Sequence, residues 1–89
     1  QYAPSWGSTC FEIPDHISFG EAAMMDILAV CAHVCQVGAI QPGRPVLVIG
    51  AGPAGNGIAQ IAPRLGASQV VLIDRSESAR TLAECQNLG

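Results

Sequence analysis

Three glycines stand directly after a short apolar run in the stretch "VLVIGAGPAGNGIAQ", residues 46–60. They occupy the pattern Gly50-x-Gly52-x-x-Gly55, and a helix-like run follows. After a buried strand, the first glycine permits a sharp turn, the second lets a pyrophosphate approach the backbone, and the third lets the helix pack closely on the strand. The helix N-terminus offers free N–H groups and a partial positive charge to that pyrophosphate. This spacing therefore favours binding of a dinucleotide.

An acidic residue, Asp74, ends the next apolar run, "QVVLID". A carboxylate at that position accepts both hydroxyl groups of an adenosine ribose and repels a 2′-phosphate, so it favours NAD over NADP. Arg75 leaves NADP open, because an arginine beside the site could bind the 2′-phosphate. Flavin proteins share the glycine pattern, so the pattern alone does not separate a nicotinamide from a flavin.

The elements that must position these residues follow from hydrophobic periodicity and from helix end signals. In chain order, we expect a weak strand at 10–13, a helix at 18–38, a strand at 45–50, a helix at 53–65, a strand at 69–74 and a helix at 76–88. The strand at 45–50 should be buried on both faces, because its apolar residues do not alternate. Pro63 should kink or loosen the end of its helix, and Gly66 should close it. The order strand, helix, strand predicts an α/β fold with a parallel βαβ unit.

The helix expected at 18–38 begins with a capping box formed by Ser18 and Glu21. The helix is apolar almost all round, so it should be buried. Asp26 lies inside this apolar run, where an unpaired carboxylate would be costly, so it must meet a cation, a donor or water.

Composition limits the class of protein. Hydrophobic residues make up 49% of the 89 residues and charged residues 12%, which suggests that other protein covers part of the surface. The net charge of −3, with four dispersed arginines, argues against nucleic acid or an anionic membrane as partner. No apolar run reaches the length of a membrane span. The cysteines at 10, 31, 35 and 85 lack paired spacing, so reduced thiols and a cytoplasmic location are expected, with Cys31 and Cys35 as buried apolar groups.

The residues that precede the glycines carry a resemblance to a known family. The segments "IPDHISFGEAAMM", "DILAV", "PGRPVLVIGAGPAG" and "GASQVVLID" resemble the zinc-dependent medium-chain alcohol and polyol dehydrogenases, the sorbitol dehydrogenase-like group. The resemblance implies a catalytic, GroES-like domain joined to a Rossmann domain. Residues 1–25 would be the end of the catalytic domain, and residues 26–89 the start of the NAD-binding domain. The chain would thus be a fragment: a partial Rossmann fold preceded by a buried linking helix.

Matched position by position, the resemblance implies the following cofactor-binding residues: Gly50, Gly52, Pro53, Ala54, Gly55, Asp74, Arg75 and Arg80. Ala54 matches a position near the nicotinamide. Arg80 is the nearest match to an arginine that lies along the adenine, and Arg75 competes for that role. Asp26 matches an acid or cysteine at or beside the catalytic zinc; the alternative is a carboxylate bonded to a nearby backbone group or arginine.

The expected function is transfer of a hydride from a small alcohol or polyol to NAD, assisted by Zn²⁺, which lowers the pKa of the alcohol. No catalytic residue is identified in the chain, and the fragment alone should be inactive. The resemblance also implies that the remaining segments of the same enzyme pack against this chain. It further implies that the full-length enzyme is a homo-oligomer. Two alternatives stay open: a zinc-free quinone reductase that uses NADPH, and a nucleotide-sensing Rossmann module without enzymatic activity.

Overall fold

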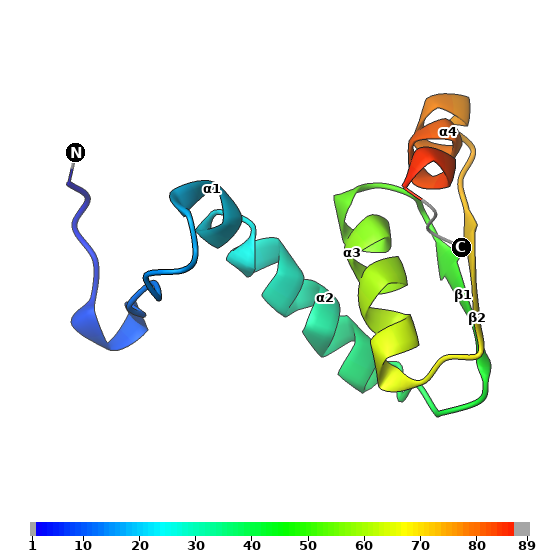
Figure 1. Cartoon of the computed structure of the whole chain (residues 1–89), viewed down its shortest axis with the longest axis horizontal. Helices are drawn as coiled ribbons and strands as arrows, with labels where there is room; N and C mark the ends of the chain where they lie inside the picture. The colour runs from blue at the N-terminus through cyan, green and yellow to red at the C-terminus, as the bar shows by residue number, and fades with distance from the viewer. Residues whose placement is uncertain (1, 87–89) are drawn as a thin grey trace.

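The structure is a computed structural model that describes residues 2–86. In chain order its elements are η1 (Gly7–Thr9), α1 (Phe19–Ala22), α2 (Met25–Val37), β1 (Pro45–Ile49), α3 (Pro53–Ile61), η2 (Ala62–Leu65), β2 (Gln69–Ile73) and α4 (Glu77–Cys85). The strands β1 and β2 form a two-stranded parallel sheet, and α3 connects them (Figure 1). The predicted α/β class and the βαβ unit are confirmed.

The sheet and α3 enclose the main core. β1 and β2 pair without a bulge, from Pro45 opposite Gln69 to Ile49 opposite Ile73. Since successive side chains of a strand point to opposite faces, a helix can cover only one set of them. The buried residues of this core are Val48, Ala59, Ala62 and Val70, and the partly buried ones are Ile40, Val46, Ile58, Ala67 and Leu72. The core therefore lies between α3 and one face of the sheet.

The other face of β1 is open, so the prediction of burial on both faces is wrong for this chain. Val48 is 7% exposed, whereas Leu47 and Ile49 are 59% and 79% exposed. None of the elements within residues 2–86 covers these two side chains. The run of apolar residues correctly predicted a strand with apolar side chains on both faces. Within residues 2–86, α3 covers only one of these faces.

The helix expected at 18–38 is interrupted between α1 and α2. Its capping box is confirmed: the Glu21 N–H donates to Ser18 Oγ at 3.3 Å, and the Ser18 N–H donates to Glu21 Oε2 at 2.8 Å. The Met24 N–H then donates to the Glu21 carbonyl, three residues back, which tightens the chain at this point. Because α1 buries no side chain, packing does not hold it in line with α2.

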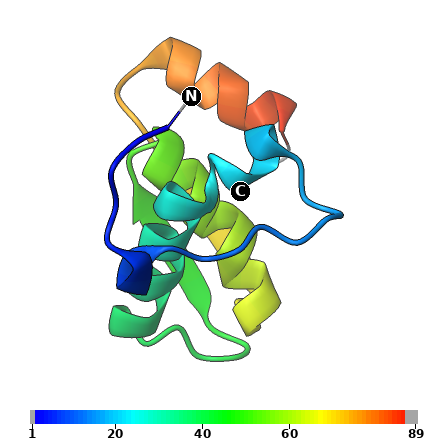
Figure 2. The same ribbon diagram turned by 90° about the vertical axis from the view of Figure 1, so that its left-hand side faces the viewer.

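The prediction that the linking helix is buried all round is also wrong for this chain. On α2 only Cys31 and Cys35 are buried, and this part of the cysteine prediction is confirmed. α2 packs against α3, beside which it lies in Figures 1 and 2. Its apolar residues Met25, Val30 and Val37 are exposed. A helix with one neighbour buries one face.

The ends of the later helices follow the sequence signals. α3 gives way to η2 around Pro63, and Gly66, with φ +94°, closes the turn. Ser76 caps α4, with its Oγ accepting the Ala79 N–H at 3.3 Å. The expected helix extended to residue 88, and residues 87–89 lie outside the described part of the chain.

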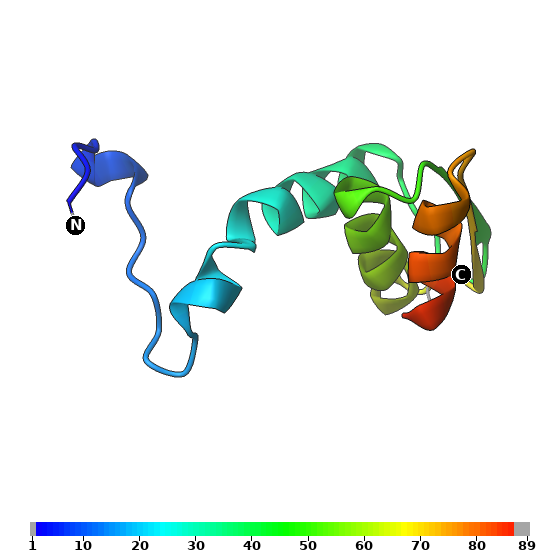
Figure 3. The ribbon, with the colours of Figure 1, turned by 90° about the horizontal axis from the view of Figure 1, so that it is seen from above.

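The N-terminal segment forms no strand at 10–13, so that weak prediction is wrong. These residues are extended and lie at the opposite end of the molecule from the sheet (Figures 1 and 3). An extended segment becomes a strand only beside a pairing partner, and residues 2–86 offer none there. Within the same residues, none of the helices combines the length and hydropathy that a bilayer crossing requires.

Candidate functional site

The turn between β1 and α3 consists of Gly50, Ala51 and Gly52, and Pro53 occupies the first position of α3. Gly50 has φ +110°, a backbone conformation that residues with a side chain rarely adopt. Its N–H donates to the Ile73 carbonyl at 2.7 Å, which fastens the turn to the end of β2. The sharp turn predicted for Gly50 is therefore present.

Gly55 lies where the first turn of α3 touches this loop. A Cβ built on Gly55 would overlap the carbonyl oxygen of Gly50, so only glycine lets the helix approach the strand end this closely. A Cβ built on Gly52 would meet no atom within 4 Å, so the space beside Gly52 is open. The geometry agrees with the predicted roles of both glycines, while pyrophosphate binding stays a prediction.

The carbonyl groups of the turn are directed toward α3. The backbone N–H of Asn56 donates to the Gly52 carbonyl at 2.9 Å, and Asn56 Nδ2 donates to the Ala51 carbonyl at 3.2 Å. Because C=O and N–H of a trans peptide point in opposite directions, the Gly52 N–H points away from Asn56. No side chain of the described residues caps α3, so the N–H groups of Ala54 and Gly55 are available at its first turn. Such an end suits an anion.

Asp74 directly follows β2, and its carboxylate is bound on both oxygens. Oδ1 accepts the Ser76 N–H at 2.6 Å, and Oδ2 accepts the Ala51 N–H at 2.7 Å. These two hydrogen bonds, the one from Ser76 first, hold the pKa of Asp74 below its ordinary value. Each ionised carboxylate oxygen retains capacity for a further donor, such as a ribose hydroxyl. Sequence reasoning missed that Asp74 also anchors the glycine turn.

The two candidate arginines have different surroundings. A hollow of about 400 Å³ at the ends of the strands is lined by Ile49, Gly50, Ile73, Asp74 and Arg75. Arg80 lies on α4 and donates from Nη1 to the Asp74 carbonyl at 2.6 Å. Arg75 is thus the arginine that lines the hollow, whereas Arg80 stabilises the backbone at Asp74.

Asp26 lies in the first turn of α2 and is exposed. Water therefore solvates its carboxylate. Of the three expected partners, a cation, a donor or water, Asp26 meets water. Across residues 2–86, no three His, Cys, Asp or Glu side chains gather as a set of metal ligands. The described residues do not by themselves form a zinc site, and a zinc role for Asp26 stays a prediction.

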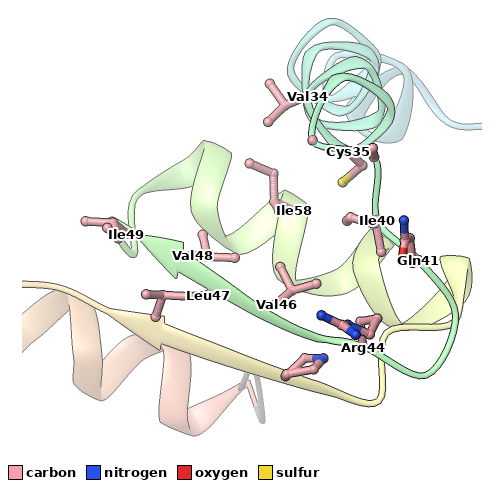
Figure 4. Close-up of a pocket in the computed structure, with 13 residues that line it drawn as sticks. Val34, Cys35, Ile40, Gln41, Arg44, Val46, Leu47, Val48, Ile49 and Ile58 are labelled. Carbon is pink, nitrogen blue, oxygen red and sulfur yellow. The ribbon is translucent and has the colours of Figure 1, made fainter.

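A larger hollow, of about 620 Å³, lies between the end of α2 and β1 (Figure 4). Most of the residues that line it are apolar, with Val34, Cys35 and Ile58 among those drawn in the figure, while Gln41 and Arg44 add polar groups. It contains none of the predicted site residues. Burial, and then the neighbouring Cys31, raise the pKa of the Cys35 thiol. A raised pKa disfavours the reactive thiolate, so the Cys35 thiol is not activated as a nucleophile.

Asn56 is a residue of the site that the sequence analysis did not single out. It belongs to the first turns of α3 and bonds two successive carbonyl groups of the glycine turn. The signal that could have found it is a polar amide placed directly after Gly55 in the otherwise small and apolar stretch "GPAGNGIA".

Comparison with known proteins agrees with these features. Over 80 residues the chain is 41% identical to sorbitol dehydrogenase of Rattus norvegicus and 39% identical to that of Homo sapiens, matches that cover 90% of this chain and 22% of each relative. It is 36% identical over 74 residues to a probable D-xylulose reductase A of Aspergillus clavatus, covering 83% of this chain and 21% of that protein.

A solved structure, the alcohol dehydrogenase of Thermus sp. ATN1, matches with a TM-score of 0.77 and 35% identity, covering 89% of this chain and 23% of that chain. No protein-family model matches the sequence. The predicted resemblance is confirmed: the chain is homologous to one segment of the medium-chain alcohol and polyol dehydrogenases. It spans about a fifth of the length of these relatives.

Proposed function

We propose that the protein containing this chain oxidises a small alcohol or polyol, with NAD as the hydride acceptor. The observation that carries the proposal is that Gly50, Asp74 and Arg75 line one hollow, at the carboxyl ends of two parallel strands. Ligands of doubly wound α/β proteins bind at that edge of the sheet. Homology to sorbitol and alcohol dehydrogenases supports the same reaction.

Each residue of the turn has a role in this proposal. The N–H groups of Gly52, Ala54 and Gly55 bind the pyrophosphate, and Pro53 starts the helix without an N–H of its own. Ala54 lies near the nicotinamide. These groups bind and orient the cofactor, and NAD, when bound, supplies the hydride-accepting chemistry.

The end of β2 recognises the adenosine. Asp74 accepts the ribose hydroxyl groups, and its negative charge disfavours a 2′-phosphate. Arg75 lines the hollow, and we assign it to the adenine. Arg80 donates to the Asp74 carbonyl and so supports the end of β2. The balance of charge between Asp74 and Arg75 sets the preference for NAD over NADP.

We also propose the wider organisation that the homology implies. Residues 1–25 belong to a catalytic domain and residues 26–89 to the NAD-binding domain of a homo-oligomeric enzyme. Asp26 lies at or beside a catalytic Zn²⁺ whose other ligands come from outside residues 2–86. The exposed position of Asp26 at the start of α2 leaves its carboxylate accessible for that role.

Steady-state kinetics of the complete protein test the proposal. We expect reduction of NAD by sorbitol, xylitol or ethanol, loss of activity on removal of zinc with a chelator, and a preference for NAD that weakens in the Asp74→Ala variant. Asp15→Ala is the matched control, because Asp15 is an exposed acid outside the site. Stronger use of NADP than NAD would contradict the assignment of Asp74. Quinone reduction with NADPH, or nucleotide binding without turnover, would support one of the two alternatives instead.

A further inference from the structure

The Ala51 peptide groups are held by side chains from two different elements. Asp74, at the end of β2, accepts the Ala51 N–H, and Asn56, on α3, donates its Nδ2 hydrogen to the Ala51 carbonyl. Ala51 is 3% exposed, so both hydrogen bonds are shielded from water on the Ala51 side. Both backbone polar groups of Ala51, its N–H and its carbonyl, are thus held by side-chain hydrogen bonds.

Fixing the Ala51 carbonyl also fixes the next N–H group. The carbonyl of Ala51 and the N–H of Gly52 belong to one planar peptide unit. When Asn56 holds the carbonyl against α3, the Gly52 N–H is turned to the opposite side. A Cβ built on Gly52 would meet no atom within 4 Å, so a ligand can approach the backbone there. The backbone N–H of Asn56 holds the Gly52 carbonyl in the same direction. One side chain and its own backbone therefore orient two successive peptide units.

The amide of Asn56 is costly for the fold. Its Oδ1 atom is buried, and no donor among the described residues reaches it. A buried carbonyl oxygen without a partner costs roughly 1–3 kcal/mol. An apolar side chain of similar size would avoid that cost, so folding alone does not explain an amide here.

We propose that Asn56 is a positioning residue for the dinucleotide, which orients the Gly52 N–H toward the pyrophosphate by holding the Ala51 carbonyl. This inference rests on the proposed function, because it names a further residue of the same cofactor site. Asn56 does not touch the reacting atoms. It preorganises the turn together with Asp74, so the site loses less freedom when the cofactor binds.

Binding of NADH to the complete protein, measured by calorimetric titration, tests the inference. Asn56→Leu keeps the size of the side chain and removes the donor, so we expect about tenfold weaker NADH binding with an unfolding temperature that is unchanged or higher. Gln60→Leu is the matched control. Gln60 lies one turn further along α3, and its Nε2 donates to a backbone carbonyl, that of Asn56, at 3.4 Å. We expect Gln60→Leu to bind NADH as the wild type does.

A second variant gives a readout that a purely structural role would not produce. In Asn56→Asp, the protonated carboxyl can donate to the Ala51 carbonyl, whereas the ionised form repels it. Burial of this position and the adjacent carbonyl oxygen should raise the pKa of the introduced carboxyl. We therefore expect weak NADH binding at pH 8 that recovers toward the wild-type value as the pH falls to 5. The wild type measured in parallel corrects for the nearby charged groups, Asp74 and Arg80. This profile also remains informative if Asn56→Leu does not fold.

The outcomes separate the inference from the proposed function. If the wild type binds NADH, and Asn56→Leu and Asn56→Asp bind it equally well at every pH, Asn56 has no positioning role while the cofactor site stands. If the wild type binds no dinucleotide, the proposed function fails and this inference fails with it.

Discussion

Residues 2–40 and residues 45–86 are both rich in apolar side chains, but only the second region encloses a core of its own. The buried hydrophobic residues of the second region are Val48, Ala51, Ala59, Ala62, Val70 and Ala83, whereas those of the first are Cys31 and Cys35. Even here Cys31 is buried against Gly57 of α3, and α2 as a whole packs on α3 of the second region. The first region therefore depends on its neighbours for burial.

The difference shows where each region finds its packing partners. In residues 45–86 a helix follows a strand at once, and the glycine turn brings the two into contact, so the partner is nearby in the sequence. In residues 2–40 the large side chains Trp6, Phe11 and Phe19 are 82%, 90% and 86% exposed. Exposed side chains of this size are candidates for contact with other protein. All three lie in residues 1–25, the proposed end of the catalytic domain, and in the proposed enzyme the rest of that domain covers them.

The largest expected effect concerns the isolated chain. We expect residues 1–89 alone to unfold without a cooperative transition in urea and to form no NADH with any alcohol. The two-stranded sheet has an open edge on each side within the described residues, and a sheet usually needs three or more strands with a covered face. Circular dichroism during urea titration tests the first expectation, and an assay of NADH formation with alcohols tests the second. A sharp sigmoidal transition would show that residues 45–86 suffice to stabilise themselves and residues 2–40.

The next effect contrasts one glycine from each region, in the complete protein. Gly55→Ala should destabilise by about 3 kcal/mol or more and abolish NADH binding, because its Cβ meets backbone that cannot rotate away. Gly20→Ala in α1 should stabilise by less than about 1 kcal/mol, because a new Cβ there meets only Ser18 Oγ, at 4.0 Å. Urea unfolding and NADH titration of both variants test the contrast. Equal effects at the two positions would contradict it.

A third prediction tests the contact that joins the regions. A Cβ on Gly57 would lie 2.5 Å from Cys31 Sγ, so Gly57→Ala should destabilise by about 1–3 kcal/mol. Cys31→Ala makes room for that methyl group, so the double variant should be more stable than the sum of the two single effects predicts. A double-mutant cycle by urea unfolding measures the coupling. Additive effects would mean that α2 and α3 shift apart at low cost.

A smaller effect compares two serine caps. Ser76→Ala should lower the global stability by about 1 kcal/mol, because α4 packs on β2 and buries Ala83. Ser18→Ala should leave the global stability nearly unchanged, because α1 buries nothing within the described residues. Hydrogen exchange would still detect faster opening at Glu21, whose N–H loses its acceptor. A global loss at Ser18 equal to that at Ser76 would show that α1 is packed in the complete protein.

The smallest effect is a pH dependence of the second region. The pKa of Asp74 is lowered in the folded state, so its stabilising contribution is present above the unfolded pKa of about 3.9 and is lost as the pH falls through the folded pKa. Between pH 5 and pH 3 the wild type should therefore lose more stability than Asp74→Asn, and the two should converge at the acid end. Parallel pH dependences would mean that the hydrogen bonds to Ala51 and Ser76 do not stabilise the fold.

The sequence by itself determined the order of elements and the form of the glycine turn. Positive φ at Gly50, the close approach at Gly55, the caps at Ser18 and Ser76 and the end of α3 near Pro63 all depend on residues within a few positions of one another. Such features follow from backbone sterics and from local hydrogen bonds, and these act at short range along the chain. For this reason the glycine turn could be located before any fold was known.

Only the tertiary structure decided which faces are buried and which side chains hold the turn. The break between α1 and α2, the open face of β1 and the exposure of Asp26 depend on which elements pack against them. The bonds from Asp74 and Asn56 to the Ala51 peptide groups join residues of the turn to the end of β2 and to α3. Apolar periodicity indicates that a residue can be buried, but burial itself requires a partner surface, and the position of that surface is set by the fold of the whole chain.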